Sequence, residues 1–217
     1  MSTKRIAVIL AGNGVFDGAE IHEATMTLYA ISKNGGAYDI FAPNIEQHHV
    51  INHLTGEEMP EKRNVLVESA RIARGKIKDL NELNVSDFDA LMLPGGFGVA
   101  KNLSDFAFKG TEMTVLKSFE KVILEFVEQS KPIGALCISP AIVVKVLEEA
   151  TVTIGQDNDT IIAIEALGGK HKITTHGEVV IDQKYKLATT PCYMLDATIS
   201  EIGDGAQNVV KAVFDMI

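Results

Sequence analysis

Short apolar runs alternate with stretches of helical periodicity along most of the chain. Residues 4–11 are almost continuously apolar and rich in β-branched side chains, which is typical of a strand buried on both faces. Residues 20–34 follow with helical spacing, and the two glycines after them end that helix. The same pattern predicts further strands at 38–42, 89–93, 132–136 and 186–189, and further helices at 113–129, at 139–149 and at the C-terminus as far as residue 214.

Strands separated by helices favour right-handed crossover connections. Such connections build a parallel sheet, so the chain is predicted to be an α/β three-layer sandwich with helices on both faces of a mostly parallel sheet. No linker or repeat interrupts the 217 residues, which favours one domain over 1–217. Residues 44–80 fit the alternation poorly. We expect them to form an excursion from the sheet, with a helix at about 65–74.

Composition narrows the possible functions. Apolar residues make up 46% of the chain, enough for a large core, and charged residues make up 23%. A formal net charge of -9 argues against nucleic-acid binding, which needs clustered Lys and Arg. No apolar run of membrane-spanning length occurs, so no membrane partner is expected. A secretory signal pattern is missing and two cysteines make no disulfide framework, which favours the cytoplasm, with a mature organellar form as the alternative.

Cys137 lies at the junction of a predicted strand and a predicted helix. The segment 131–141 reads K-P-I-G-A-L-C-I-S-P-A, and Pro140 suits the first turn of a helix. Ligands of open parallel sheets gather at the carboxyl ends of the strands. A residue at such a nucleophile elbow is exposed above the sheet, and the positive end of the helix is expected to lower the pKa of the thiol. The alternative is a buried structural cysteine.

Two other segments follow strands at the same edge. In L-P-G-G-F-G, residues 93–98, glycines allow backbone N–H groups to approach a reacting oxygen, although a plain tight turn is the alternative. In G-A-E-I-H-E-A, residues 18–24, Glu20 and Glu23 are three apart and can share a helical face near the cysteine. Glutamates in a first turn also serve simply as partners of the helix dipole.

These segments, in this order, resemble the ThiJ/PfpI superfamily, which has the class I glutamine amidotransferase-like fold. Within it the chain is most similar to the ElbB-like subfamily (isoprenoid biosynthesis glyoxalase). The marks include G-V-F-D-G-A-E-I-H-E-A at 14–24, R-N-V-L-V-E-S-A-R-I-A-R-G at 63–75, P-G-G-F-G-V-A-K-N-L at 94–103, G-A-L-C-I-S-P-A at 134–141 and T-T-P-C-Y-M at 189–194. The resemblance covers nearly the whole chain and implies a flavodoxin-like sheet and a homodimer.

The resemblance also implies roles for individual residues. Cys137 would be the nucleophile and Glu23, rather than Glu20, the carboxylic acid that contacts its sulfur. Gly95 and Gly96 would supply oxyanion-hole amides, with the Ile138 N–H as a further donor. Three residues, His22, Asn13 and Cys192, are candidates for the rim of the site, and a Cys137–Cys192 interaction is a hypothesis.

The departures from the superfamily pattern change the expected chemistry. Amidotransferases and PfpI-type peptidases place a His directly after the nucleophile, where this chain has Ile138. Glutaminase and peptidase activities are therefore not expected. The deglycase branch has a His about 20 residues later, but residues 153–159 contain none, and the nearest downstream histidines are His171 and His176.

No cofactor or metal is expected. Phosphate-binding loops of the P-loop kind are missing. His48, His49 and His53 fall close together in the excursion, but adjacent histidines seldom share a tetrahedral metal site, so a solvated surface is the expectation.

Three functions stay open at this point. The first is a slow glyoxalase III-type lyase without cofactor, in which Cys137 attacks a 2-oxoaldehyde such as glyoxal or methylglyoxal and Glu23 moves a proton between its carbons. The second is a non-enzymatic sensor of oxidative stress, in which Cys137 becomes a sulfinic acid. The third, implied only by the subfamily, is an accessory role in isoprenoid biosynthesis.

Overall fold

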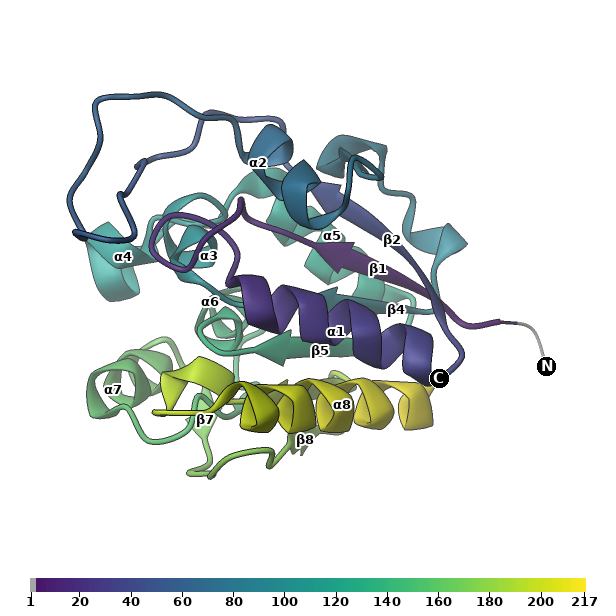
Figure 1. The fold of residues 1–217 in the computed structure, drawn as a ribbon. Helices are drawn as coiled ribbons and strands as arrows, with labels where there is room; N and C mark the ends of the chain where they lie inside the picture. Colours follow the sequence, from purple (N-terminus) through teal and green to yellow (C-terminus); the bar gives the residue numbers. More distant parts are fainter. Residues whose placement is uncertain (1–2) are drawn as a thin grey trace.

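The computed structural model describes residues 3–217 and is built around a twisted central sheet (Figure 1). Within these residues, seven strands pair in the order β3-β2-β1-β4-β5-β9-β8. All neighbouring pairs are parallel except β8 and β9, which are antiparallel. The strands are β1 (Arg5–Ile9), β2 (Ala37–Ala42), β3 (Lys78–Asp79), β4 (Ala90–Leu93), β5 (Ile133–Leu136), β8 (Val180–Asp182) and β9 (Leu187–Thr190).

The first strand shows why helices cover both faces. Ile6 and Val8 pack in one hydrophobic cluster with α1 (Ile21–Lys33) and α8 (Ile199–Met216), while Ala7 and Ile9 pack in a second cluster with α5 (Lys117–Glu128) and α6 (Ser139–Val146). Alternate side chains of a strand point to opposite faces, so a continuously apolar strand buries both. In Figure 1, α1 and α8 lie side by side against one face. The predicted three-layer sandwich is therefore confirmed.

The predicted elements agree with the structure apart from their ends. The helix predicted at 113–129 begins only at Lys117, because Met113 and Val115 are buried in an extended segment and Val115 bridges to Ser104. The helix predicted at 139–149 ends at Val146, three residues before Glu149 takes a positive φ of 64°. The excursion contains the predicted helix as α2 (Val65–Ile72).

Several short elements have no clear periodicity in the sequence. The helices among them are α3 (Phe97–Lys101), α4 (Phe106–Lys109), α7 (Asn158–Ala166) and the single 3₁₀ turns η1 (Leu80–Glu82), η2 (Val85–Asp87), η3 (Gly110–Glu112) and η4 (Cys192–Met194). Two further strands, β6 (Thr151–Val152) and β7 (Lys170–His171), pair in parallel as a separate small sheet. These elements matter because α3, α4, α7 and η4 surround the end of β5.

The first part of the excursion is a long loop that reaches over to α4 (Figure 1). It is held to the loop after β1 by a hydrogen bond from the Ile51 N–H to Asp17 Oδ2, at 2.7 Å. The His48 ring lies 4.2 Å from that of Phe108 in α4, centroid to centroid. The excursion thus packs beside the loops at the carboxyl ends of the strands, where the candidate site lies.

Candidate active site

Cys137 is the first residue after β5 and has a positive φ of 60°. Its N–H donates to the Thr190 carbonyl at 3.0 Å, and α6 begins two residues later at Ser139, whose hydroxyl donates to the Pro94 carbonyl at 2.9 Å. A left-handed backbone at a residue other than glycine costs about 1–3 kcal/mol, so the packing on both sides holds the turn. The strand, the cysteine and the helix thus form the sharp turn that the sequence predicted, while the role of Cys137 as a nucleophile stays a prediction. The expected exposure of its side chain above the sheet is wrong, because the thiol is buried. The side chain is 7% exposed.

Glu23 lies in the first turn of α1, and its side chain is completely buried. Its carboxyl group hydrogen-bonds the Cys137 side chain. The two carboxyl oxygens also accept backbone hydrogen bonds, Oε2 from the Gly95 N–H at 3.0 Å and Oε1 from the Tyr193 N–H at 3.2 Å. Glu20 instead caps α1, because its Oε2 accepts the Glu23 N–H at 2.7 Å. Glu23 is thus the carboxylic acid next to the thiol, as the resemblance implied.

Burial dominates the titration of this pair. It raises the pKa of Glu23 to about 8, and the negative charge of Glu20 adds to that rise, while the hydrogen bonds from Tyr193, Cys137 and Gly95 act against it. The pKa of Cys137 is also raised well above its usual value, first by burial and then by the charge of Glu23. The expected lowering of this pKa by the start of α6 is therefore wrong, because desolvation outweighs the helix terminus.

The loop after β4 brings two glycines against the pair. A Cβ at position 95 would lie 2.7 Å from Glu23 Oε2 and 2.9 Å from Cys137 Sγ, so only glycine fits there. The Gly95 N–H donates to Glu23. One of the two glycine amides predicted for an oxyanion hole is therefore already hydrogen-bonded to the glutamate. The Gly96 N–H interacts with the Cys137 sulfur and lowers its pKa. The oxyanion roles of Gly96 and of the Ile138 N–H stay predictions.

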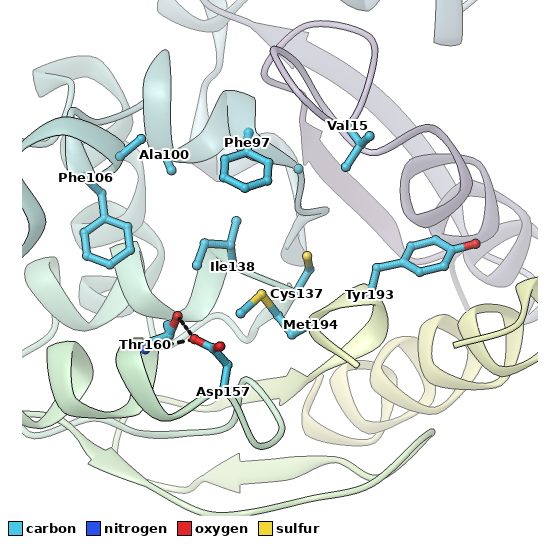
Figure 2. Close-up of a pocket in the computed structure, with 12 residues that line it drawn as sticks. Val15, Phe97, Ala100, Phe106, Cys137, Ile138, Asp157, Thr160, Tyr193 and Met194 are labelled. Atoms are coloured by element: carbon cyan, nitrogen blue, oxygen red, sulfur yellow. Dashed lines mark hydrogen bonds between the residues drawn. The ribbon is translucent and has the colours of Figure 1, made fainter. Parts of the chain in front are cut away.

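A cavity of about 350 Å³ opens above Cys137. Figure 2 shows Phe97, Ile138 and Met194 around the Cys137 side chain, with Phe106 on one side and Tyr193 on the other. Most of its walls are apolar. The lining residues are Val15, Gly96, Phe97, Ala100, Phe106, Ala107, Cys137, Ile138, Asp157, Thr160, Tyr193 and Met194.

The three candidate rim residues lie in different places. His22 is exposed, and its Nδ1 lies 2.8 Å from the Tyr193 hydroxyl, so it touches the site through Tyr193. Asn13 is half-buried in the loop after β1, but Val15 is the residue of that loop that lines the cavity. Cys192 is buried, has a positive φ of 45°, and has its sulfur close to Gly205 of α8. Both cysteines are free thiols in the described chain.

The other histidines lie away from Cys137. His171 accepts a hydrogen bond from the Ile154 N–H at 3.1 Å, and His176 lies 3.8 Å from a carboxyl oxygen of Glu201. His53 packs against Phe16 with ring centroids 4.9 Å apart. Between residues 3 and 217, no histidine lines the cavity and no group of three metal-ligating side chains comes together. In that same part of the chain, no helix has the length and hydrophobicity needed to cross a membrane.

Sequence reasoning missed Tyr193 and most of the cavity wall. Tyr193 supplies a backbone donor to Glu23, a hydroxyl partner to His22 and part of the lining. Its place after Cys192 in T-T-P-C-Y-M, directly after a predicted strand, was the available signal. Phe106 and Thr160 reach the cavity from α4 and α7, which have no periodic pattern to reveal them.

Comparison with known proteins places the chain among relatives that match nearly all of it. No family model matches. The human glutamine amidotransferase-like class 1 domain-containing protein 3, mitochondrial, is 45% identical over 222 residues, covering 98% of this chain and 83% of that protein. The mitochondrial ES1 protein of Danio rerio is 35% identical over 230 residues, covering 97% of this chain and 85% of that protein.

Solved structures also match nearly the whole chain. The crystal structure of an isoprenoid biosynthesis protein with an amidotransferase-like domain, from Ehrlichia chaffeensis, is 37% identical and has a TM-score of 0.92, covering 98% of this chain and 100% of its own. DJ-1beta of Drosophila melanogaster has a TM-score of 0.57 at 15% identity, covering 99% and 96% of the two chains, which shows a shared fold alone. A ThiJ/PfpI domain protein of Brachyspira murdochii, 15% identical with a TM-score of 0.58, likewise shows a shared fold alone. From its curated relatives, this chain belongs to the glutamine amidotransferase-like class 1 family.

Proposed function

We propose that this protein converts 2-oxoaldehydes to 2-hydroxy acids without a cofactor, with Cys137 as the nucleophile. The observation that carries the proposal is the fully buried Glu23, which hydrogen-bonds Cys137 beneath a cavity and has a pKa of about 8. A carboxyl group with a pKa near neutrality can both give and accept a proton at the working pH. Its contact with the Cys137 side chain places this proton next to the reacting sulfur, which supports an acid–base role for Glu23.

The reaction needs no external oxidant. The Cys137 sulfur bonds to the aldehyde carbon, and the thiol proton passes through Glu23 to the aldehyde oxygen, giving a hemithioacetal. Glu23 then takes the proton from that carbon and returns it to the neighbouring carbonyl carbon, while the hydroxyl proton moves to the former ketone oxygen. The aldehyde carbon is thereby oxidised to a thioester and the ketone carbon reduced to an alcohol. Water cleaves the thioester and restores the thiol.

Ile138 and the cavity lining argue against amide hydrolysis. Ile138 stands where amidotransferases and peptidases of the superfamily have a histidine, and it forms part of the apolar wall. Without a histidine, Glu23 is the proton carrier at the cysteine, and we expect turnover to be slow. The two relatives described above are mitochondrial by name, which lends support to the organellar alternative for the compartment.

Lactate formation from methylglyoxal tests the proposal. We expect the purified protein to form lactate, and Cys137→Ser and Glu23→Gln each to lower kcat/KM by at least about 100-fold. Cys192→Ser, which removes the other buried thiol, is the matched control and retains turnover. Absence of lactate in the native protein, or equal lactate formation by Cys137→Ser, would overturn it.

A further inference from the structure

The cavity above Cys137 is larger and less polar than a two- or three-carbon aldehyde requires. Its volume of about 350 Å³ lies in the range of pockets that enclose whole organic ligands. Five of its lining side chains are large and apolar: Val15, Phe97, Phe106, Ile138 and Met194. Figure 2 shows Phe97 and Phe106 on the side of the cavity away from Tyr193, with Ile138 between Phe106 and Cys137. A bound apolar chain would therefore contact hydrocarbon beyond the reacting carbons.

The ionisable side chains at this cavity are a carboxyl group and groups that are mostly neutral near pH 7. The neutral groups include Cys137 and, hydrogen-bonded to it, the protonated Glu23. Asp157 lies in its wall and accepts hydrogen bonds from the Thr160 N–H at 3.0 Å and hydroxyl at 2.6 Å. Of the residues that the structure describes, no lysine or arginine lines the cavity. An anionic substrate would therefore be desolvated without a partner, which is costly.

Lys101 directly follows Ala100, which lines the cavity, but the contacts of its ammonium group lie outside this cavity. Its ammonium group donates to the Phe16 carbonyl at 2.8 Å and lies 5.4 Å from the centre of the Phe97 ring. It lines a neighbouring cavity of about 220 Å³ together with Phe16 and Phe97. Phe97 borders both cavities, whereas Lys101 is absent from the lining of the cavity above Cys137.

We infer that the site takes neutral 2-oxoaldehydes with an apolar substituent longer than methyl, and rejects those that carry a carboxylate or phosphate. This inference rests on the proposed function for the reacting group. The recognition of the substituent rests on the lining alone: hydrocarbon around the tail, Asp157 in the wall and, among the residues that the structure describes, no lysine or arginine to pair with an anion.

Alkylation of Cys137 tests the recognition without requiring turnover. In a Cys192→Ser background, iodoacetamide and iodoacetate differ mainly in charge, and N-ethylmaleimide and N-hexylmaleimide differ only in chain length. Rates are divided by those of the same reagents with glutathione. We expect the neutral reagent to be favoured by a further factor of about ten, and N-hexylmaleimide to be favoured over N-ethylmaleimide by up to about fourfold per buried methylene. Ratios equal to those of glutathione would overturn the inference.

A charge introduced into the wall checks where the preference arises. Ala107 is exposed on α4 and lines the cavity, so Ala107→Lys places a cation there, with Ala107→Gln as the neutral control. We expect Ala107→Lys to speed the reaction with iodoacetate about tenfold relative to Ala107→Gln. An unchanged ratio would show that the lining does not set the preference and would count against the inference.

Turnover separates this inference from the proposed function. 2-Oxopentanal and 4,5-dioxopentanoate have the same number of carbons, but the first ends in a methyl group and the second in a carboxylate. We expect kcat/KM to rise from methylglyoxal to 2-oxopentanal and to fall at least about tenfold for 4,5-dioxopentanoate. Equal values for all three would overturn the inference and leave the proposed function standing. If no 2-oxoaldehyde reacts, the proposed function fails, and the alkylation ratios still decide whether the cavity prefers neutral apolar groups.

Discussion

Glu23 and Cys137 form a buried acid–thiol pair in which the glutamate carboxyl hydrogen-bonds the cysteine side chain. Backbone amides of Gly95 and Tyr193 hold both carboxyl oxygens, so the carboxyl cannot turn away from the sulfur. Burial and mutual repulsion resist two negative charges in this space. Near neutral pH the pair is therefore expected to hold one negative charge at most, and its behaviour depends on where the proton lies.

Replacing Glu23 by glutamine changes the reactivity of the thiol. The charge of Glu23 raises the pKa of Cys137, so Glu23→Gln is expected to lower that pKa and to speed alkylation by iodoacetamide roughly tenfold at about pH 8. The measurement is the rate of Cys137 labelling against pH. Glu128→Gln, at an exposed position near the end of α5, is the control and should follow the native profile. A profile unchanged by Glu23→Gln would show that the pair is not coupled.

The same glutamate predicts a loss of stability at alkaline pH. Its pKa in the folded protein is about 8 against 4.5 for an ordinary glutamate, so folding favours the protonated carboxyl. This contribution is complete below about pH 4.5 and is lost as the pH rises through about 8, at a cost of up to roughly 5 kcal/mol. Urea unfolding at about pH 5 and about pH 9 measures it. Glu23→Gln should reduce the difference between the two pH values, and an equal difference would contradict the assignment.

The charge of Glu20 is expected to raise the pKa of Glu23. This negative charge is the second cause, after burial, of the raised Glu23 pKa. Glu20→Gln keeps an oxygen that can accept the Glu23 N–H at the start of α1 but removes the charge. Because the folded-state pKa of Glu23 is expected to be lower in this variant, we expect its loss of stability to be complete at a lower pH than in the native protein. The difference in stability between about pH 5 and about pH 9 should therefore be smaller than in the native protein, and an equal difference would contradict this role of Glu20. Far-UV circular dichroism checks that α1 is retained.

Gly95 and Gly203 are expected to respond in opposite directions to a methyl group. At Gly95 the new Cβ meets both Glu23 and Cys137, so Gly95→Ala should destabilise the protein by about 1–3 kcal/mol and perturb Cys137 alkylation. Gly203 lies inside α8, where the nearest atom to a new Cβ is the Met26 sulfur at 3.8 Å. Gly203→Ala should therefore stabilise by about 0.5–1 kcal/mol. Destabilisation of similar size at both sites would argue against a specific contact at Gly95.

Oxidation by peroxide distinguishes the proposed enzyme from the alternative oxidative-stress sensor. A buried thiol with a raised pKa is a poor target, because oxidation follows thiolate character and access. We expect intact-mass analysis after mild peroxide to show Cys137 oxidised no faster than glutathione. Rapid and selective addition of two oxygen atoms at Cys137 would favour the sensor instead. The control is Cys137→Ser, which should gain no mass at this position.

The local part of the site was predictable from the sequence, and the part made by packing was not. A strand, a cysteine and a helix start within 131–141 led to the elbow, and the glycines after β4 led to its neighbour loop. Glu23 was chosen over Glu20 only by resemblance, since both suit the same helix face. The sign of the Cys137 pKa was missed because a helix terminus is visible in sequence and complete burial is not.

The cavity walls show the same limit. Phe106, Thr160 and Met194 come from three elements that are distant along the chain and meet only in the fold. The helices α4 and α7 are short or weakly amphipathic, so no hydrophobic periodicity in the sequence predicts them. The single domain and the homodimer stay predictions.

The two outer strands of the sheet have a bearing on how copies of this chain meet. Between residues 3 and 217, the outer strands β3 and β8 are two and three residues long. Unpaired backbone groups on an outer strand are templates for joining a neighbour's sheet, and very short outer strands offer few of them. The protein is thereby guarded against the edge-to-edge association that begins many aggregates. Any homodimer is expected to form through helices and loops, leaving each sheet complete within its own chain.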